Sequence, residues 1–382
     1  MERNLFTADH EAYRDTVREF VAREVVPQHS RWEDERWIDR SVFTAAAKHG
    51  IYGLQIPEEF GGAGEFDYRF RMVAAEEIAN AHSLSFALTV SLQDDLVLHY
   101  LLDLTTPEQK RRWLPGFARG EIVGALAMTE PGTGSDLQAI RTNARRDGTD
   151  WILNGQKTFI SSGIMADLVI VAARTDPSAG SRGFSLFVVE RDTPGFKRGR
   201  KLDKIGLPAQ DTAELFFDDV RVPAENLLGT KGRGLQHLMG HLPRERLGVA
   251  VKAIANCRAV FEETRRYCSE RTAFGGAIGK FQHVRFELAE MAAEIDVAQA
   301  YVDKSVLAFN DGALTPVDAA KGKLHVSELQ KRVVDRCMQL HGGYGYMRDY
   351  PVARAFVDTR IQTIYGGTSE IMKEIIGRDL AD

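Results

Sequence analysis

The spacing of apolar residues changes twice along this 382-residue chain, and that change constrains the fold more than any other feature. Apolar residues recur at helical intervals from residue 8 to about residue 120. Short β-rich runs at 151–155, 168–173, 184–189 and 213–217 then alternate with Gly, Pro and Asp turns. Helical spacing returns after Gly232 in long segments, among them 246–271 and 281–309.

This order predicts a helical block, a β domain over roughly 122–226 and a second helical block, because each block must bury its own apolar face. We place the domains at 1–121, 122–230 and 231–382. The most apolar long stretch, 84–102, contains Gln93, Asp94, Asp95 and His99, which excludes a membrane span and favours a buried helix. A Thr-Pro-Glu sequence at 106–108 predicts the start of another helix.

The composition is that of an ordinary globular protein, with 44% hydrophobic and 27% charged residues. A net charge of -5 disfavours nucleic-acid binding, which needs a basic surface. Cys257, Cys268 and Cys337 lack metal or redox spacing, so we expect reduced thiols and no metal site. The first residues contain neither a secretory core nor an acid-poor transit peptide, which favours a cytoplasmic bacterial protein over a mature mitochondrial matrix protein.

Residues 127–136 (AMTEPGTGSD) combine small, cyclic and hydroxyl side chains directly after an apolar run. Gly132 and Gly134 allow the main chain to approach a ligand closely, and Thr129 and Ser135 offer hydroxyls. Clusters of this kind are also typical of plain turns. Taken alone, the segment is therefore either a turn or a loop suited to a flat polar ring and a diphosphate.

The whole chain resembles the acyl-CoA dehydrogenase family, and within it most closely the long-chain branch. The segments that carry the likeness are 127–136, 206–217 (GLPAQDTAELFF), 261–267 (FEETRRY) and 339–347 (QLHGGYGYM). The resemblance implies an N-terminal helical domain, a middle β domain of barrel or sandwich type, and a C-terminal domain like a four-helix bundle. It also implies an acyl-CoA substrate, fatty acid β-oxidation chemistry, electron-transferring flavoprotein as electron acceptor, and a homotetramer built as a dimer of dimers.

Oxidation of a thioester between its α and β carbons needs a base for the α-proton and a cofactor that accepts the β-hydride. Nicotinamide is disfavoured, since Gly132-x-Gly134 and Gly343-x-Gly345 both lack the third glycine of a Rossmann fingerprint. The resemblance implies FAD, whose flavin N5 would accept the hydride. The residues that it places around the flavin ring are Leu126, Met128, Thr129, Gly134, Ser135, Phe159, Ile160 and Ser161.

Further cofactor residues implied by the resemblance lie in the C-terminal block. They are Arg271, Phe274, Gln282, Gln339, Gly342, Gly343, Thr368 and Glu370. The family pattern has Arg271, Phe274 and Gln282 reach the flavin of a neighbouring subunit, where a guanidinium suits a diphosphate. Ala273 replaces the threonine typical of the family, which removes one expected hydrogen bond to FAD.

Most family members carry their catalytic glutamate at the position that Gly366 occupies here. The resemblance to the long-chain and isovaleryl-specific branches moves the base to Glu245. A glutamate in an Arg-Glu-Arg run is by default a solvated helix face, so the vacancy at Gly366 carries this assignment. We expect Pro243 to start or bend a helix just before Glu245, and Gly248, one turn on, to leave room for a ligand.

In the resulting mechanism Glu245 removes the α-proton, and burial by the bound acyl chain raises its pKa. The Gly366 N–H and a flavin ribityl hydroxyl hold the charge that develops on the thioester oxygen. The candidate substrate-binding residues are Ser135, Arg246, Tyr365, Gly366 and Gly367, with Leu88 and Leu92 suited to the hydrocarbon tail. The chain length is left open, and branched, ring-bearing and carrier-protein-bound acyl groups also fit this pattern.

Other functions fit parts of the sequence. An acyl-CoA oxidase or a flavin monooxygenase of similar fold would also hold a flavin, although oxidases usually carry an extra C-terminal domain. A non-catalytic flavoprotein acting as a binding or assembly module is disfavoured by the net acidity and by Glu245. Hydrolase and P-loop functions are disfavoured because G-x-S-x-G and H-E-x-x-H are missing and Gly279-Lys280 is followed by Phe281.

Overall fold

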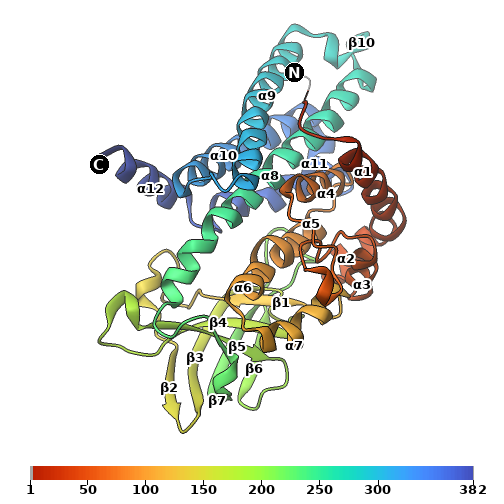
Figure 1. Ribbon diagram of the computed structural model, residues 1–382. Coiled ribbons are helices and arrows are strands. Elements are labelled where there is room, and N and C mark those ends of the chain that lie inside the picture. The colour runs from red at the N-terminus through yellow and green to blue at the C-terminus, as the bar shows by residue number, and fades with distance from the viewer. Residues whose placement is uncertain (1–2, 382) are drawn as a thin grey trace.

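The computed structural model describes residues 3–381, and its first part is helical (Figure 1). The elements are α1 (Ala8–Phe20), the π-helical η1 (Val21–Val25), α2 (Val26–Glu35), α3 (Ser41–Lys48), the 3-10 turn η2 (Glu58–Phe60), α4 (Tyr68–Asn80), α5 (Leu84–Ser91), the π-helical η3 (Leu92–Val97), α6 (Leu98–Leu104) and α7 (Pro107–Ala118). The buried helix expected at 84–102 is confirmed as α5, η3 and α6. The start at 106–108 is also confirmed, because Thr106 and Gln109 form a capping box before α7.

The middle part is a β sheet. Its strands are β1 (Gly124–Ala127), β2 (Asn143–Asp147), β3 (Asp150–Ser161), β4 (Leu168–Arg174), β5 (Phe184–Glu190), β6 (Phe196–Lys201), β7 (Thr212–Val222) and β8 (Leu227–Leu228). They form one eight-stranded sheet in the order β6-β7-β3-β2-β4-β5-β8, with β1 parallel to β4. The predicted runs lie in β3, β4, β5 and β7. The short strands β2 (NARRD) and β6 (FKRGRK) were not predicted, because their charged side chains hide the apolar pattern.

Both faces of the central strands are buried. In β4, Val169 and Val171 belong to the core inside the β domain, whereas Ile170 belongs to the core shared with the N-terminal helices. The Trp151 ring of β3 lies 5.3 Å from the Phe187 ring of β5, although these strands are not neighbours in the sheet. The sheet therefore closes around its own core as in a barrel or sandwich, and its outer face packs on helices.

The C-terminal part is helical again. Its elements are α8 (Gly234–Glu270), the hairpin strands β9 (Thr272–Ala273) and β10 (Gly276–Ala277), α9 (Gln282–Asn310), α10 (Pro316–His341), the 3-10 turn η8 (Gly342–Tyr346), α11 (Pro351–Asp358), the 3-10 turn η9 (Thr359–Thr363) and α12 (Ser369–Ala381). Helices α8, α9, α10 and α11 share one apolar core, to which α4 also contributes. This confirms the expected helical domain, and α9 matches the predicted 281–309 segment to within one residue.

Pro243 does not start a helix, since it lies inside α8; that it bends the helix stays a prediction. A proline within a helix removes one backbone hydrogen bond. The turns before it are held by packing on the sheet: a Cβ at Gly234 would lie 2.9 Å from Ser185 Cα, and Leu238 is buried in the core shared with the β domain. Tertiary packing therefore extends α8 beyond the boundary that the local sequence favours.

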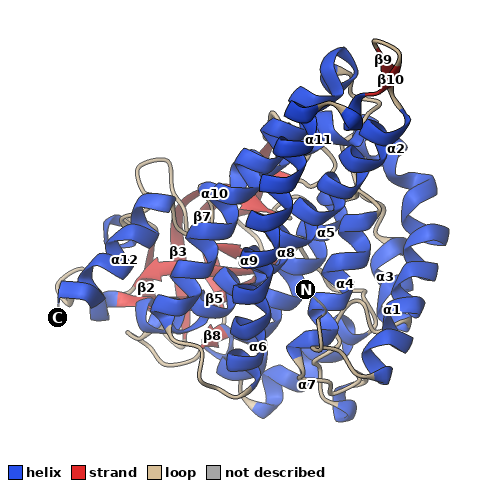
Figure 2. Ribbon diagram, turned by 90° about the horizontal axis from the view of Figure 1, so that it is seen from above, coloured by secondary structure: helices blue, strands red, loops and turns tan. Residues whose placement is uncertain are grey.

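The arrangement places the β domain at one end of the molecule and the β9–β10 hairpin at the other, with α8 running between them (Figure 1). Seen from above, α10 and α12 lie over the sheet, while α1 to α3 lie along the opposite edge (Figure 2). None of the helices in residues 3–381 is long and apolar enough to cross a membrane. No element crosses 121/122 or 230/231, but these exact domain boundaries stay predictions.

Candidate active site

The structure brings Glu245 of α8 against Gly366, which lies in the loop between η9 and α12. A Cβ built on Gly366 would lie 3.4 Å from Glu245 Oε1 and 3.8 Å from Val249 Cγ2. These two predicted catalytic residues come from distant parts of the chain and meet at one point. A side chain at position 366 and the side chain at 245 would therefore occupy adjoining space.

The Glu245 carboxylate is poorly solvated. Its Oε2 atom is buried and has no hydrogen-bond partner among residues 3–381. Burial raises the pKa of Glu245, and the positive charges of Arg246, Lys252 and Lys323 partly oppose that rise. A carboxylate with one buried oxygen that lacks a donor, and with a raised pKa, is suited to accept a proton.

Two cations hold the loop that faces Glu245. Gly366 and Gly367 have φ of 65° and 92°, a region that favours glycine. Arg246 Nε donates to the Gly366 carbonyl at 3.5 Å, and Lys323 Nζ donates to the Gly367 carbonyl at 2.6 Å. The predicted substrate residues Arg246, Gly366 and Gly367 are thus in one place, next to Tyr365, whose pKa is raised by burial and by the Glu245 carboxylate.

Lys323 and Tyr100 are site residues that sequence reasoning missed. Lys323 is fully buried on α10, at helical spacing from buried Ala319 and Val326, and a lysine inside such an apolar stripe is the signal that could have revealed it. Tyr100 on α6 has a buried hydroxyl without a hydrogen-bond partner in the described chain. Burial and the Glu245 carboxylate both raise the Tyr100 pKa, and no sequence pattern marks this residue.

A second group of predicted residues gathers at the edge of the β domain. The Thr158 N–H donates to the Thr129 carbonyl at 2.9 Å, and buried Lys157 Nζ donates to the Met128 carbonyl at 3.0 Å and to Glu130 Oε1 at 2.9 Å. These bonds join the 127–136 segment to the end of β3. The structure therefore brings the predicted flavin segments 126–135 and 159–161 together.

The surface of this edge is open. Phe159 has φ 58° and is 67% exposed, and Gly134 and Ser135 are exposed. A Cβ on Gly134 would meet nothing within 4 Å, so a flat ligand could lie against the main chain. The side chains of Leu126 and Ile160 point into cores instead, so these two could contact a ligand only through their backbone.

The predicted cofactor residues of the C-terminal block form a third, separate group. The exposed ones at the ends of α8 and α10 are Arg271, Phe274, Gln282, Gln339, Gly342 and Gly343. The Arg271 guanidinium lies 5.5 Å from the Tyr344 ring, which links the two helix ends. They lie at the hairpin end, away from the β domain, so one chain does not bring them to segments 126–135 and 159–161 (Figure 1).

Thr368 and Glu370 lie elsewhere, at the start of α12 and close in sequence to Gly366. The Thr368 hydroxyl accepts from the Ile371 N–H at 3.3 Å, as a helix cap does. Glu370 is exposed. These two predicted cofactor residues therefore belong with the Gly366 loop and not with the hairpin end.

The residues expected to hold the acyl tail are half-buried. Leu88 on α5 packs against the core of the C-terminal helices, and Leu92 on η3 packs against the core shared by the N-terminal helices and the β domain. The expectation that Gly248 leaves room beside Glu245 is wrong, because a Cβ there would lie 3.0 Å from Asp95 Oδ2. The missing side chain instead allows α8 to pack closely on η3.

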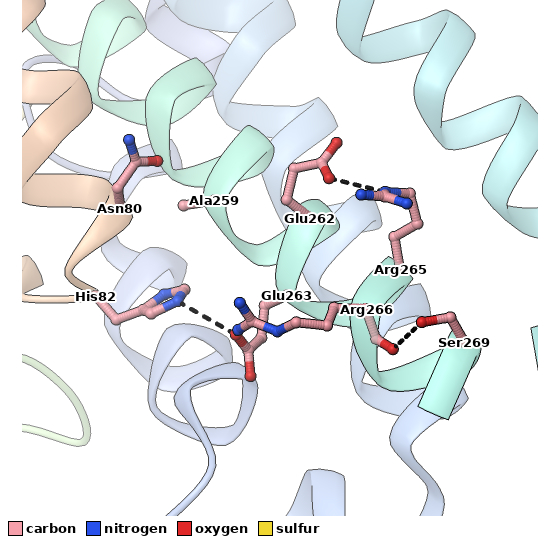
Figure 3. Close-up of a pocket in the computed structure, with 8 residues that line it drawn as sticks. All are labelled: Asn80, His82, Ala259, Glu262, Glu263, Arg265, Arg266 and Ser269. Atoms are coloured by element: carbon pink, nitrogen blue, oxygen red, sulfur yellow. Dashed lines mark hydrogen bonds and ion pairs between the residues drawn. The ribbon is translucent and has the colours of Figure 1, made fainter. Parts of the chain in front are cut away.

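A hollow of about 320 Å³ lies away from these residues, between the turn after α4 and the second half of α8 (Figure 3). The residues drawn around it are Asn80, His82, Ala259, Glu262, Glu263, Arg265, Arg266 and Ser269. Its walls carry ion pairs, including Arg265–Glu262 at 2.8 Å and His82–Glu263 at 3.9 Å. None of the predicted site residues lines it, and such walls do not suit a hydrocarbon chain.

Family models match almost the whole chain in the same order as its three parts. They are the acyl-CoA dehydrogenase N-terminal domain at 7–121, middle domain at 125–220 and C-terminal domain at 232–381. The chain belongs to the acyl-CoA dehydrogenase family. It is an enzyme of that family, as its sequence resemblance predicted.

Individual relatives support the same family assignment. The chain is 47% identical over 380 residues to the mitochondrial long-chain specific acyl-CoA dehydrogenase of Mus musculus, covering 99% of this chain and 88% of that protein. The crystal structure of acyl-CoA dehydrogenase from Geobacillus kaustophilus has a TM-score of 0.97 at 44% identity, covering 99% and 100%. A chain from the structure of an electron transferring flavoprotein of Acidaminococcus fermentans has a TM-score of 0.94 at 35% identity, covering 100% and 99%.

The contact between Gly366 and Glu245 can be tested with alanine. Gly366→Ala should lose roughly 1–2 kcal/mol of stability from its left-handed backbone. It should also lower acyl-CoA turnover, because the new Cβ would fill the space beside Glu245 Oε1, in van der Waals contact with it. Gly180→Ala is the matched control, since Gly180 has φ 56° and nothing within 4 Å of its Cβ position. Thermal unfolding should show similar losses for both, and steady-state kinetics a loss only for Gly366→Ala. If Gly366→Ala keeps the parental turnover, Gly366 is not part of the active site.

Proposed function

We propose that this enzyme oxidises an acyl-CoA thioester to the trans-2-enoyl-CoA with FAD as cofactor and Glu245 as the catalytic base. The observation that carries the proposal is the meeting of a desolvated Glu245 carboxylate with the side-chain position of Gly366. Gly366 has no side chain, and the carboxylate of Glu245 lies next to the position that a side chain at 366 would occupy. The base thus comes from α8 and not from the loop before α12.

Glu245 is suited to remove the α-proton. Its free Oε2 atom needs no donor to be displaced before it accepts a proton. Once protonated, the carboxyl is neutral, and burial favours the neutral form. A bound acyl chain excludes more water and strengthens this effect.

The Gly366 N–H is the donor that we assign to the thioester oxygen. No acceptor for this N–H is found within residues 3–381, while the carbonyls of Gly366 and Gly367 are bonded to Arg246 and Lys323. A loop fixed by two cations keeps a backbone donor in place before charge develops. Lys323 acts here as a positioning residue.

Segments 128–135 and 159–161 would hold the flavin ring, and FAD when bound supplies the acceptor for the β-hydride. The open main chain at Gly134 and the exposed ring of Phe159 fit this role. Ala273 supplies no hydroxyl, so FAD would be held with one hydrogen bond fewer than the family pattern provides. Electrons then leave to electron-transferring flavoprotein, a partner supported by the likeness to the Acidaminococcus fermentans chain.

The hairpin end would complete the cofactor site of a neighbouring subunit. The β9–β10 hairpin, which follows Arg271 and has Phe274 in its turn, lies at the opposite end of the molecule from the β domain (Figure 1). Phe274 is 99% exposed, and such exposure of a large apolar ring indicates a surface that a partner covers. We therefore propose a homotetramer arranged as a dimer of dimers.

Replacing the base should separate binding from chemistry. Glu245→Gln keeps the size of the side chain but removes the proton acceptor, so FAD and acyl-CoA should still bind. Anaerobic reduction of the flavin by saturated acyl-CoA should slow by about 10²–10⁴-fold. Adding Gly366→Glu should restore part of the rate, limited by the positive φ at 366.

Glu262→Gln is the matched control, because Glu262 lies on the same helix but is exposed and paired with Arg265. It should reduce flavin at the parental rate. If Glu245→Gln does so as well, Glu245 is not the base.

The acid limb of the pH profile of kcat/KM should report the ionisation of Glu245. The base must be ionised in the free enzyme, and its pKa is raised by burial, so kcat/KM should fall as pH decreases through a value above the usual Glu range of about 4.3. Measurement of kcat/KM from pH 4 to 9 checks this, and the limb should be missing from the residual activity of Glu245→Gln. An acid limb at or below the usual value contradicts the assignment.

Truncation of Phe274 tests the shared cofactor site. Because the ring is almost fully exposed in one chain, Phe274→Ala should change subunit stability by less than about 0.5 kcal/mol yet lower the FAD content and weaken assembly. Flavin absorbance per chain and light scattering measure these. Ile205→Ala, which removes an 80% exposed side chain from the β domain, should change neither. Full FAD content in Phe274→Ala would contradict a cofactor site shared between subunits.

A further inference from the structure

Segment 128–135, which would hold the flavin ring, is tied to the rest of the β domain by a buried ion pair. Lys157 of β3 is 1% exposed, and its Nζ donates to the Met128 carbonyl at 3.0 Å and to Glu130 Oε1 at 2.9 Å. Glu130 is 7% exposed. The pair therefore lies inside the protein, behind the surface that Gly134 and Ser135 leave open.

Glu130 joins three separate stretches of chain. Its Oε2 accepts from the Arg141 N–H at 2.7 Å and its Oε1 from the Thr142 N–H at 2.9 Å, in the stretch that leads into β2. Its own N–H and carbonyl form two bonds with Thr133, at 2.9 and 3.0 Å, which close a turn within segment 128–135. Because a buried carboxylate must be compensated for its lost hydration, the convergence of backbone and Lys157 donors keeps Glu130 in place.

Both members of the pair carry their charge at neutral pH. Burial acts to raise the pKa of the Glu130 carboxyl, but the Lys157 charge and the donated hydrogen bonds bring that pKa below its usual value. Burial lowers the pKa of Lys157 to about 8, and the charge of Glu130 opposes that fall. Each partner depends on the other, because removal of one leaves a buried charge uncompensated.

A bulge in β3 lets this one strand serve both the ion pair and the open surface. Successive side chains of a regular strand alternate between its two faces, so Lys157 and Phe159 would share a face. Between Lys157 and Ile160 the register with β7 shifts, and Phe159 takes φ 58°. As a result Lys157 is buried, whereas the Phe159 ring is exposed. The Thr158 N–H between them donates to the Thr129 carbonyl, so the bulge also fastens the segment.

We infer that Lys157 and Glu130 act together as positioning residues for the cofactor, because they hold segment 128–135 in the shape that receives the flavin ring. This rests on the proposed function, which places FAD on this segment and on Phe159. Neither charged side chain needs to touch the flavin. Lys157 fixes the Met128 carbonyl from the buried side, and Glu130 fixes the turn that follows it. A segment that is ordered in advance loses less freedom on binding, so FAD is held more tightly.

The test compares the affinity for FAD with the stability of the fold. Lys157→Met keeps the length of the side chain but removes its charge and its donors. Each holoenzyme, saturated with added FAD, is diluted, and the fluorescence of the released flavin gives the Kd. The Kd of Lys157→Met should rise at least about tenfold, the size expected for the loss of about one hydrogen bond to the cofactor.

Val169→Ala is the matched control. Val169 is fully buried on β4, in the core inside the same β domain. Its truncation should lower the unfolding temperature, because it leaves a cavity, but should not change the Kd of FAD. Thermal unfolding without added FAD, measured on both variants, separates loss of stability from loss of cofactor affinity.

A double-mutant cycle tests whether the two residues act as one pair. Glu130→Gln keeps the size of the side chain and removes the charge, so it should also raise the Kd of FAD. Lys157→Met combined with Glu130→Gln should bind FAD no more weakly than Lys157→Met alone, since no unpaired buried charge remains. If the two increases in Kd multiply in the double variant, the residues act separately and the pair is overturned.

The other outcomes are equally decisive. Parental affinity in Lys157→Met or, should that variant fail to fold, in Glu130→Gln overturns this inference and leaves the proposed function intact. An equal loss of affinity in Val169→Ala would show that any destabilisation of the β domain releases FAD, which overturns the inference as well. If the parental protein itself binds no FAD, the proposed function fails together with this inference.

Discussion

The burial of α8 is the constraint on which the site depends. Residues 246–257 are buried on every side of this helix, so each polar group there needs a partner inside the protein. Arg246 donates to Gly366 and Asn256 accepts from Gln330 Nε2 at 2.9 Å. Glu245, at the edge of this segment, has an oxygen without any partner among the described residues. Asn256 Nδ2 of the same helix also lacks a partner among residues 3–381, so it is the position of Glu245 against Gly366 that favours a proton acceptor.

The proposed placement of the base on α8 changes what the loop before α12 must do. With a glycine at 366, the loop supplies only a backbone donor, and its left-handed conformation is free of side-chain strain. The carboxylate comes instead from the middle of a long helix that packs on α4, α9 and α10. Since such a helix moves less than a loop, the base and the donor are positioned by independent elements that converge on one point.

The sequence predicted what depends on periodicity and motif, and missed what depends on packing. The continuous apolar runs of β4 and β5 were evident because both faces of these strands are buried. Pro243 was misassigned because contacts with the sheet outweigh its local effect. The role of Gly248 was wrong because a close approach of two helices and an open space both favour glycine. Lys323 was missed because only the fold shows that its charge reaches the Gly367 carbonyl.

Lys252 links Glu245 electrostatically to the buried charges of α4 and η3. Desolvation raises the pKa of Glu245 more than the three nearby cations lower it, so the balance is set by opposing effects. Lys252 is also attracted by Asp95, and burial lowers its own pKa to about 8. When an acyl chain replaces water between these groups, their interaction strengthens because the local dielectric falls.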